Sequence, residues 1–222
     1  MGELLACRII FVMNSRERVL AAIAHKQPDQ VPVDLGSTPS SGISAIAYSN
    51  LLKSIGRTDL PVQIYDVVQQ LAQPDMSIID RFGVDVLDIG RAFNTEEKDW
   101  HETILANGDK AFYPIHFNPV KQADGSYHCY DEDGKRLLAL MPQGATFFDQ
   151  SYFPYINGFP ENYDTLDEEM GRVLWSRYVH SPWDHTQDPD FWKTLREKTL
   201  QLRASKSSIR YKRMPVKWNR NF

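Results

Sequence analysis

The sequence predicts an α/β fold in which a parallel sheet is joined to a separate antiparallel part. Residues 14–90 alternate between helix and strand patterns, which is typical of strands joined by crossover helices. Residues 100–150 instead carry the Asn-Gly and Asp-Gly dipeptides of hairpin turns. Helical periodicity then returns at about residues 165–181 and 189–205.

The first helix is expected to begin after Asn14. Asn14 is a suitable N-cap residue, and Glu17 three positions later completes the pattern of a capping box. Pro28 ends this segment. Residues 31–35, with the sequence VPVDL, then indicate a short buried strand, because a proline is tolerated among the first residues of a strand. Residues 36–42 form a loop rich in Gly, Ser, Thr and Pro.

A second helix is expected over residues 43–55, where apolar residues recur at helical spacing and Gly56 follows. Two further helical pieces, residues 66–73 and 74–81, lead to a second strand at residues 84–89. This order of elements indicates a parallel sheet. Because only two parallel strands are visible, the fold is either a small α+β domain or the front part of a larger one.

The expected antiparallel insertion separates this front part from the last two helices. Its aromatic and apolar stretches alternate with turn dipeptides, as the strands of hairpins do. The three dipeptides are Asn107-Gly108, Asp124-Gly125 and Asp133-Gly134.

Composition limits the possible classes of function. The chain has 222 residues, 42% of them hydrophobic, and a formal net charge of −4, so no overall attraction to nucleic acid is expected. No apolar stretch is long enough to span a bilayer, so no membrane partner is expected. The two cysteines, Cys7 and Cys129, cannot build a disulfide framework. With the lack of an export signal, they favour a reducing, cytoplasmic location.

Both ends differ from the middle of the chain. Residues 1–12 are interpreted as a non-native or upstream extension; the LLAC motif at residues 4–7 resembles a lipoprotein cleavage box, but too few apolar residues precede it. Residues 206–222 hold six basic residues and no acid. Such a tail is either a docking arm or a frameshifted or truncated end. The structured part is therefore expected to be residues 13–205.

The first candidate site follows the first predicted strand. In parallel sheets, chemistry takes place beyond the carboxyl ends of the strands, and this is where Asp34, Ser37 and Thr38 lie. The amides and hydroxyls of the loop could hold an anionic group above the next helix. Alternatively, Ser40 or Ser41 merely caps that helix. The loop contains no glycine motif for nucleotide binding.

The second candidate site is Asp88 with Arg91, at the end of the second predicted strand. An arginine can hold a carboxylate through two parallel hydrogen bonds, so the pair predicts binding of a carboxylate-bearing ligand. The alternative is a structural ion pair at a strand end.

The third candidate substrate-binding cluster contains His180, Asp184 and His185. Two histidines and an acid can bind a metal. However, the histidines are five residues apart and Pro182 prevents a helix between them, so a loop histidine bonded to backbone is favoured. No metal ligand is assigned here.

Three short stretches form a recognisable motif. Residues 13–22 read MNSRERVLAA, residues 25–34 read HKQPDQVPVD, and residues 81–85 read RFGVD. Together they resemble the opening of the uroporphyrinogen decarboxylase (URO-D) superfamily: its first helix, its Pro-Asp-x-Val-Pro turn, its first barrel strand and the approach to its second strand. The resemblance covers about residues 13–205. It implies the N-terminal portion of a TIM (β/α)8 barrel, incomplete, with an antiparallel β-hairpin insertion.

The superfamily includes two kinds of enzyme. Its decarboxylases act on the four acetate side chains of uroporphyrinogen in porphyrin and heme biosynthesis, whereas its cobalamin-dependent methyltransferases move methyl groups between a corrinoid protein and a thiol or similar acceptor. The resemblance implies, for a decarboxylase, an Arg-Gln-Ala-Gly-Arg segment after the first strand and a Phe-Ser-Asp after the second. This chain has DLGST at residues 34–38 and GRA at residues 90–92. Loss of the basic clamp favours the methyltransferase branch.

The methyltransferase resemblance implies a zinc ion that activates a thiol, with His and Cys ligands from the second half of the barrel. No position of this chain matches those ligands. Zinc and a corrinoid are therefore expected only for a full-length relative, whose substrate would be a small molecule or a corrinoid protein. Alternatives are a uroporphyrinogen decarboxylase, or a non-catalytic binding module that docks through its basic tail. An incomplete barrel exposes a sheet edge, which predicts a dimer or aggregate. The resemblance does not determine whether this truncated form is active.

Overall fold

The computed structural model describes residues 12–93, 95–179 and 186–208, with side chains up to Ala204. These residues form a mixed α/β structure that does not close into a barrel. The helices are α1 (Ser15–Ile23), α2 (Ala45–Ser54), α3 (Met76–Arg81), α4 (Leu166–Gly171), α5 (Leu174–Tyr178) and α6 (Phe191–Ser208), with 3-10 helices η1 (Pro39–Ser41), η2 (Gly90–Ala92) and η3 (Glu97–Asp99).

The strands of the described residues form three antiparallel sheets. Their orders are β1-β3-β2, β4-β5 and β6-β7-β8-β9. The strands are β1 (Ile43–Ser44), β2 (Ile64–Asp66), β3 (Leu71–Ala72), β4 (Trp100–Ile104), β5 (Lys110–Pro114), β6 (Val120–Lys121), β7 (Tyr127–Tyr130), β8 (Leu137–Met141) and β9 (Asp149–Gln150). Strands β4 to β9 confirm the antiparallel insertion at about residues 100–150.

One continuous core joins α2 to the three sheets. Tyr48 and Leu52 of α2 pack with Ile64 of β2 and with Phe117. The Phe117 ring lies edge-on to the rings of Tyr113, Phe148 and Tyr178, at centroid distances of 4.9, 5.3 and 5.5 Å. The insertion is therefore packed into the same core as the N-terminal elements.

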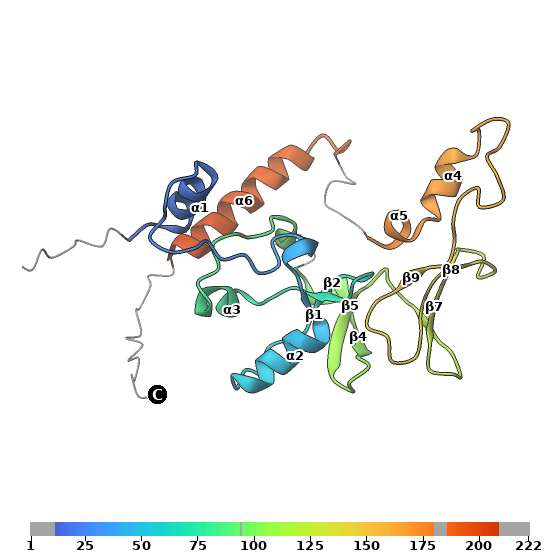
Figure 1. The fold of residues 1–222 in the computed structure, drawn as a ribbon, viewed down its shortest axis with the longest axis horizontal. Coiled ribbons are helices and arrows are strands. Elements are labelled where there is room, and N and C mark those ends of the chain that lie inside the picture. Colours follow the sequence, from blue (N-terminus) through green and yellow to red (C-terminus); the bar gives the residue numbers. More distant parts are fainter. Residues whose placement is uncertain (1–11, 94, 180–185, 209–222) are drawn as a thin grey trace, which may run out of the picture.

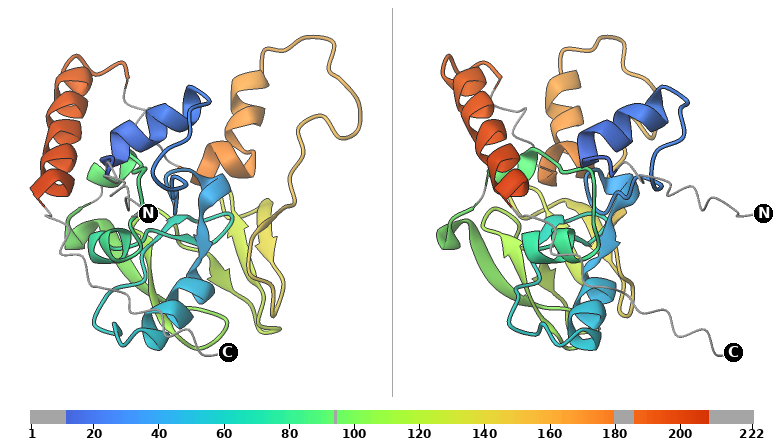
Figure 2. Two further views of the ribbon diagram at one scale, coloured as in Figure 1. Left: turned by 60° about the vertical axis from the view of Figure 1, so that its left-hand side comes forward. Right: turned by 90° about the vertical axis from the view of Figure 1, so that its left-hand side faces the viewer.

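The molecule is extended (Figure 1), with α1 and α6 near one end and β7, β8 and α4 at the other. Residues 151–165 project from the body together with α4, as Figure 2 shows. This projecting segment carries exposed apolar side chains, including Ile156 and Phe159.

The prediction of two parallel strands is wrong. Neither residues 31–35 nor residues 84–89 form a strand, although the two segments lie side by side: the amide of Asp85 donates to the carbonyl of Val33 at 2.7 Å. Pro32 has no amide hydrogen, and the amide of Val33 donates to the side chain of Asp85 at 3.0 Å. A ladder cannot extend because its donors are missing or used by a side chain.

The predicted helix at residues 66–73 is also wrong. A hairpin of β2 and β3 occupies it, because the Asp66 carboxylate accepts hydrogen bonds from the amides of Val68 and Gln69 at 3.0 and 2.9 Å. Such side-chain bonds favour a turn over a helix. Gln70 completes the turn with φ 55°.

The remaining helices follow the sequence more closely. Asn14 and Glu17 form the expected capping box of α1. Helix α2 begins within the expected segment, but Ser44 caps it instead of Ser40 or Ser41, which lie in η1. The helix expected at residues 165–181 is divided into α4 and α5.

Helix α6 covers the helix expected at residues 189–205 and continues to Ser208, three residues into the predicted tail. Residues 209–222 and residues 1–11 lie outside the described part. Among the described residues, no helix is long and apolar enough to cross a bilayer.

Candidate functional site

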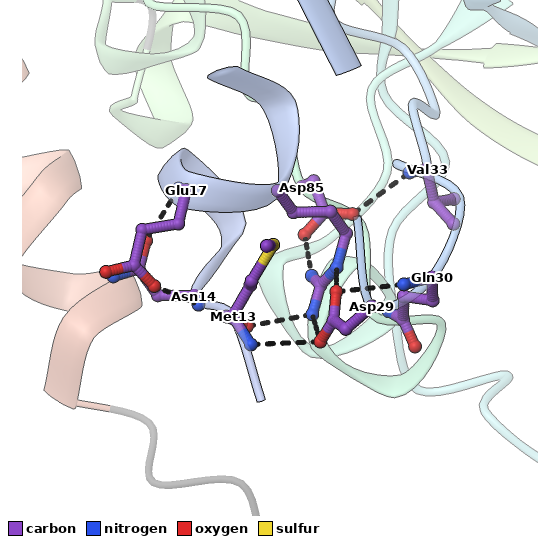
Figure 3. Close-up of polar contacts among 8 residues, drawn as sticks. Met13, Asn14, Glu17, Asp29, Gln30, Val33 and Asp85 are labelled. Atoms are coloured by element: carbon purple, nitrogen blue, oxygen red, sulfur yellow. Dashed lines mark hydrogen bonds and ion pairs between the residues drawn. The ribbon is translucent and has the colours of Figure 1, made fainter. Parts of the chain in front are cut away.

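The residues that carry the family resemblance form a buried ion network (Figure 3). Arg18 of α1 donates to both carboxylate oxygens of Asp29, at 2.7 and 3.0 Å, and to Oδ1 of Asp85 at 2.5 Å. Arg18 is 4% exposed, and the Asp85 side chain is fully buried. The network therefore joins α1, the Pro-Asp-x-Val-Pro turn and the segment at residues 84–89.

Backbone groups complete this network. The carbonyl of Met13 accepts from Arg18, and the amides of Met13 and Gln30 donate to Asp29. Hydrogen bonds from Arg18 hold the pKa of Asp29 down at about 2 against the opposing effect of desolvation. Every charged group of the network has a partner inside it, so its role is to position the segments beside it.

The first candidate site is a closed loop. The Asp34 carboxylate accepts from the amide and the hydroxyl of Ser37, at 3.1 and 2.5 Å. Gly36 has φ +81° and lies so close to Pro74 that an added Cβ would approach the Pro74 ring to 3.2 Å. Glycine is needed here for both reasons. Thr38 is exposed at the start of η1.

The second candidate site also contacts Pro74. Nη2 of Arg91 donates to the carbonyl of Pro74 at 2.5 Å, and the amide of Gly90 donates to Oδ1 of Asp88 at 2.9 Å. Burial lowers the pKa of Arg91, while Asp75, Asp88 and Tyr48 oppose that shift. No ion pair joins Arg91 to Asp88 among the described residues, so the alternative of a structural ion pair at this position is not supported.

The structure therefore brings the two candidate segments together at Pro74. Gly36 packs on its ring and Arg91 binds its carbonyl. Helix α6 contacts η2, where Nζ of Lys198 donates to the carbonyl of Ala92 at 2.7 Å and lies 4.8 Å from the centroid of the Phe93 ring. The η2 segment that contains Arg91 therefore contacts both Pro74 and α6.

Tyr65 is a site residue that sequence reasoning missed. It lies in β2 between the buried residues Ile64 and Asp66, on the opposite face of the strand. Its hydroxyl is buried and has no hydrogen-bond partner among the described residues. Burial raises the pKa of this hydroxyl above its usual range, as do the nearby carboxylates of Asp66, Asp88 and Asp34.

A strand pattern at residues 64–66 was the available signal for Tyr65. The helical pattern predicted from residue 66 onward conflicts with that signal, and Tyr65 does not lie at the end of a predicted strand.

The third candidate cluster, His180, Asp184 and His185, lies outside the described residues. The described part of the chain contains no group of three His, Cys, Asp or Glu side chains that could hold a metal ion. A zinc site therefore does not fit these residues, and no metal ligand is assigned among them.

A small cavity elsewhere does not serve as a substrate site. It lies between the start of α2 and the hairpin strands, beside Gln70 and Tyr113, and measures about 20 Å³. That volume suits a single water molecule. The hydroxyl of Tyr113 donates to Oε1 of Gln70 at 2.7 Å, which already pairs the polar groups there.

Comparison of the chain with protein-family models, curated proteins and solved structures found no match. The resemblance to the URO-D superfamily thus rests on its motif residues.

Chemically, the cluster around Pro74 is acidic. The negative charges of Asp66, Asp88 and Asp34 raise the pKa of Tyr65. Arg91 is a cation near Asp88, but its Nη2 already binds the backbone carbonyl of Pro74. Such a site disfavours a ligand with many carboxylates and favours a neutral or cationic one.

Proposed function

We propose that this chain forms the substrate-binding end of a URO-D-like protein of the cobalamin-dependent methyltransferase type. One observation carries the proposal: the segments after residues 31–35 and 84–89 meet at Pro74 and build an acidic cluster around Tyr65. The parts of the chain that resemble the family's first two barrel strands supply this cluster together. This convergence supports the incomplete-barrel origin of the fold, with the two segments in the places of the first two strands.

The acidity of the cluster separates the two branches of the superfamily. A porphyrinogen substrate carries several carboxylates and needs cations to bind them. Asp34, Asp66 and Asp88 would repel such a substrate, and Arg91 offers a single guanidinium whose Nη2 is already bonded. The proposal therefore favours methyl transfer between a corrinoid, as substrate, and a thiol or similar acceptor over decarboxylation.

The physical setting proposed for this protein is cytoplasmic. Cys129 is buried as a free thiol, and burial raises its pKa to about 12. A thiol kept protonated in this way suits a reducing compartment but does not require one. The exposed apolar side chains of Ile23, Val31 and Phe82 support the proposal of a dimer or aggregate.

Two assays on the whole chain test the proposal. In the first, methylcobalamin is incubated with 2-mercaptoethanol, with and without added Zn²⁺, and the loss of methylcobalamin absorbance is followed. In the second, uroporphyrinogen is supplied and coproporphyrinogen is measured. We expect protein-dependent demethylation that Asp88→Asn lowers and Asp59→Asn does not, because the carboxylate of Asp59 is exposed and already pairs with Arg57. No coproporphyrinogen should form.

Coproporphyrinogen formation would replace the proposal with decarboxylation. Inactivity in both assays, together with a salt-sensitive association that is lost when residues 206–222 are deleted, would favour the non-catalytic binding module.

A further inference from the structure

An arm that projects from the body of the molecule carries exposed apolar side chains. The arm is residues 151–171, which comprise the projecting segment at residues 151–165 and helix α4 (Figure 2). Phe159 is 85% exposed and Ile156 is 73% exposed. Three further large apolar residues of the arm are also exposed: Phe153, Tyr163 and Met170. Exposed apolar surface on a projecting element marks an interaction site.

Contacts within the arm hold its loop in shape. The hydroxyl of Tyr152 donates to the carboxylate of Glu169 in α4. The ring of Tyr155 lies edge-on to the ring of Tyr163, with 6.3 Å between their centroids. At the tip, the amide of Gly158 donates to the carbonyl of Tyr155 at 2.9 Å. A partner therefore meets an arm that is already formed, which lowers the entropy cost of binding.

The charge of the arm defines the chemistry of this partner. The arm holds five acidic residues and no basic one. Two of the acids, Glu168 and Glu169, pair with Arg172 just beyond the arm. The other three are exposed, and their carboxylates have no partner in the part of the chain that the structure describes: Glu161, Asp164 and Asp167. A suitable partner is therefore both basic and apolar.

The sequence of this chain contains such a segment. Residues 209–222 hold five basic residues and no acid. Six apolar or aromatic residues accompany them: Ile209, Tyr211, Met214, Val216, Trp218 and Phe222. Helix α6 ends at Ser208, on the side of the molecule away from the arm (Figure 1). A second copy is therefore better placed than the same copy to supply these residues to the arm.

We propose that the arm of one copy binds residues 209–222 of a second copy. The basic side chains of this segment pair with Glu161, Asp164 and Asp167, and its aromatic side chains cover Ile156 and Phe159. Two arms do not bind each other, because both are acidic and like charges across an interface repel. Since the two contacting surfaces differ, the contact can repeat from copy to copy. This association goes beyond the proposed methyl transfer and does not depend on it.

Sedimentation velocity of the whole chain tests the contact. At low ionic strength we expect wild-type copies to form oligomers that grow with protein concentration. Raising NaCl from about 50 mM to about 500 mM should weaken the association at least about tenfold, because salt screens exposed ion pairs. A wild type that stays monomeric at every concentration, as it would if each arm bound residues 209–222 of its own copy, overturns the proposal.

Two charge-reversal variants locate the surfaces. The arm variant replaces the three unpaired carboxylates by lysine: Glu161→Lys, Asp164→Lys and Asp167→Lys. The tail variant replaces three basic residues by glutamate: Arg213→Glu, Lys217→Glu and Arg220→Glu. Each variant alone should associate at least about tenfold more weakly than the wild type. The matched control makes the same change of charge at exposed acids of other elements and should associate as the wild type does: Asp59→Lys, Glu97→Lys and Glu102→Lys.

Mixing the arm variant with the tail variant shows that the contact joins two copies. The basic tail of the first then meets the unchanged arm of the second, so the mixture should form a complex that neither variant forms alone. Phe159→Ser in the tail variant should weaken this complex at least about fivefold, because it removes an apolar anchor. The same substitution in the arm variant should have no effect, since that arm is not used.

The substitutions in the arm lie at exposed positions, so the melting temperatures of these variants should match that of the wild type. The proposal is overturned if NaCl does not weaken the association, if the arm variant associates as strongly as its control, or if the mixed variants form no complex. An equal effect of Phe159→Ser in either partner would also overturn it.

Discussion

Replacing Asp85 with alanine should remove the carboxylate that joins α1 to residues 31–35. Its Oδ1 binds Nη1 of Arg18 at 2.5 Å, and its Oδ2 accepts from the amide of Val33 at 3.0 Å. Because the Asp85 side chain is fully buried, water cannot replace either bond without rearrangement. Removing one partner of such a buried pair costs about 3–5 kcal/mol.

That loss is large against the total stability of a domain, which is about 5–15 kcal/mol. Urea unfolding followed by circular dichroism measures it. With a urea dependence of about 3 kcal/mol per molar, the midpoint should fall by about 1–2 M. Asp85→Asn keeps the shape and one acceptor, so its midpoint should lie between those of the wild type and Asp85→Ala.

Asp59→Ala is the control for this experiment, since it breaks the exposed pair with Arg57 and should shift the midpoint little. A midpoint for Asp85→Ala within about 0.3 M of that control, at an unchanged urea dependence, would refute a stabilising role for the network.

Three other predictions concern single residues. The pKa of Asp29 is held at about 2, below its unfolded value of about 3.9, so the stability that it contributes is complete above about pH 4 and is lost as the pH falls toward 2. The difference in urea midpoint between wild type and Asp29→Asn should therefore shrink over that range. A constant difference would contradict this. In a Cys7→Ser background, the buried thiol of Cys129, whose pKa burial raises to about 12, should react with Ellman's reagent only as the protein unfolds; rapid reaction of the native protein would contradict its burial. Lys198→Met should speed hydrogen exchange in α6, because it removes the hydrogen bond from this helix to η2. Lys193→Met, at an exposed position of the same helix, should not. Equal exchange in both variants would show that Lys198 does not hold the helix.

The sequence predicted best those features that depend on neighbouring residues. The capping box of Asn14 and Glu17 forms as expected. The turns at Gly108, Gly125 and Gly134 all have positive φ, so the hairpins of the insertion could be predicted from their dipeptides. Each signal involves residues within a few positions of one another.

The wrong predictions arose where a side chain competes with the backbone. Asp85 takes the amide of Val33, 52 residues away in the sequence, and Asp66 takes two amides of its own turn. Hydrophobic pattern shows neither event. It therefore suggested strands at residues 31–35 and 84–89 and a helix at residues 66–73.

The candidate site was predicted in part. Asp34, Ser37, Asp88 and Arg91 could be predicted because they lie at or just beyond the ends of residues 31–35 and 84–89. The loops that follow these two segments do meet at Pro74, although neither segment forms a strand. The pairing of Arg91 with a backbone carbonyl and the unpartnered hydroxyl of Tyr65 depend on three-dimensional contacts that no spacing in the sequence reveals.

The NMR spectrum of Gly36→Ala tests most directly that the two segments meet at Pro74. An added Cβ at Gly36 would approach the Pro74 ring to 3.2 Å, and Nη2 of Arg91 binds the Pro74 carbonyl. If the segments share this contact, the signals of both Ser37 and Arg91 should shift in Gly36→Ala. Neither should shift in Gly108→Ala, where glycine also has positive φ but an added Cβ would meet nothing within 4 Å. Shifts confined to the first segment would contradict a single site.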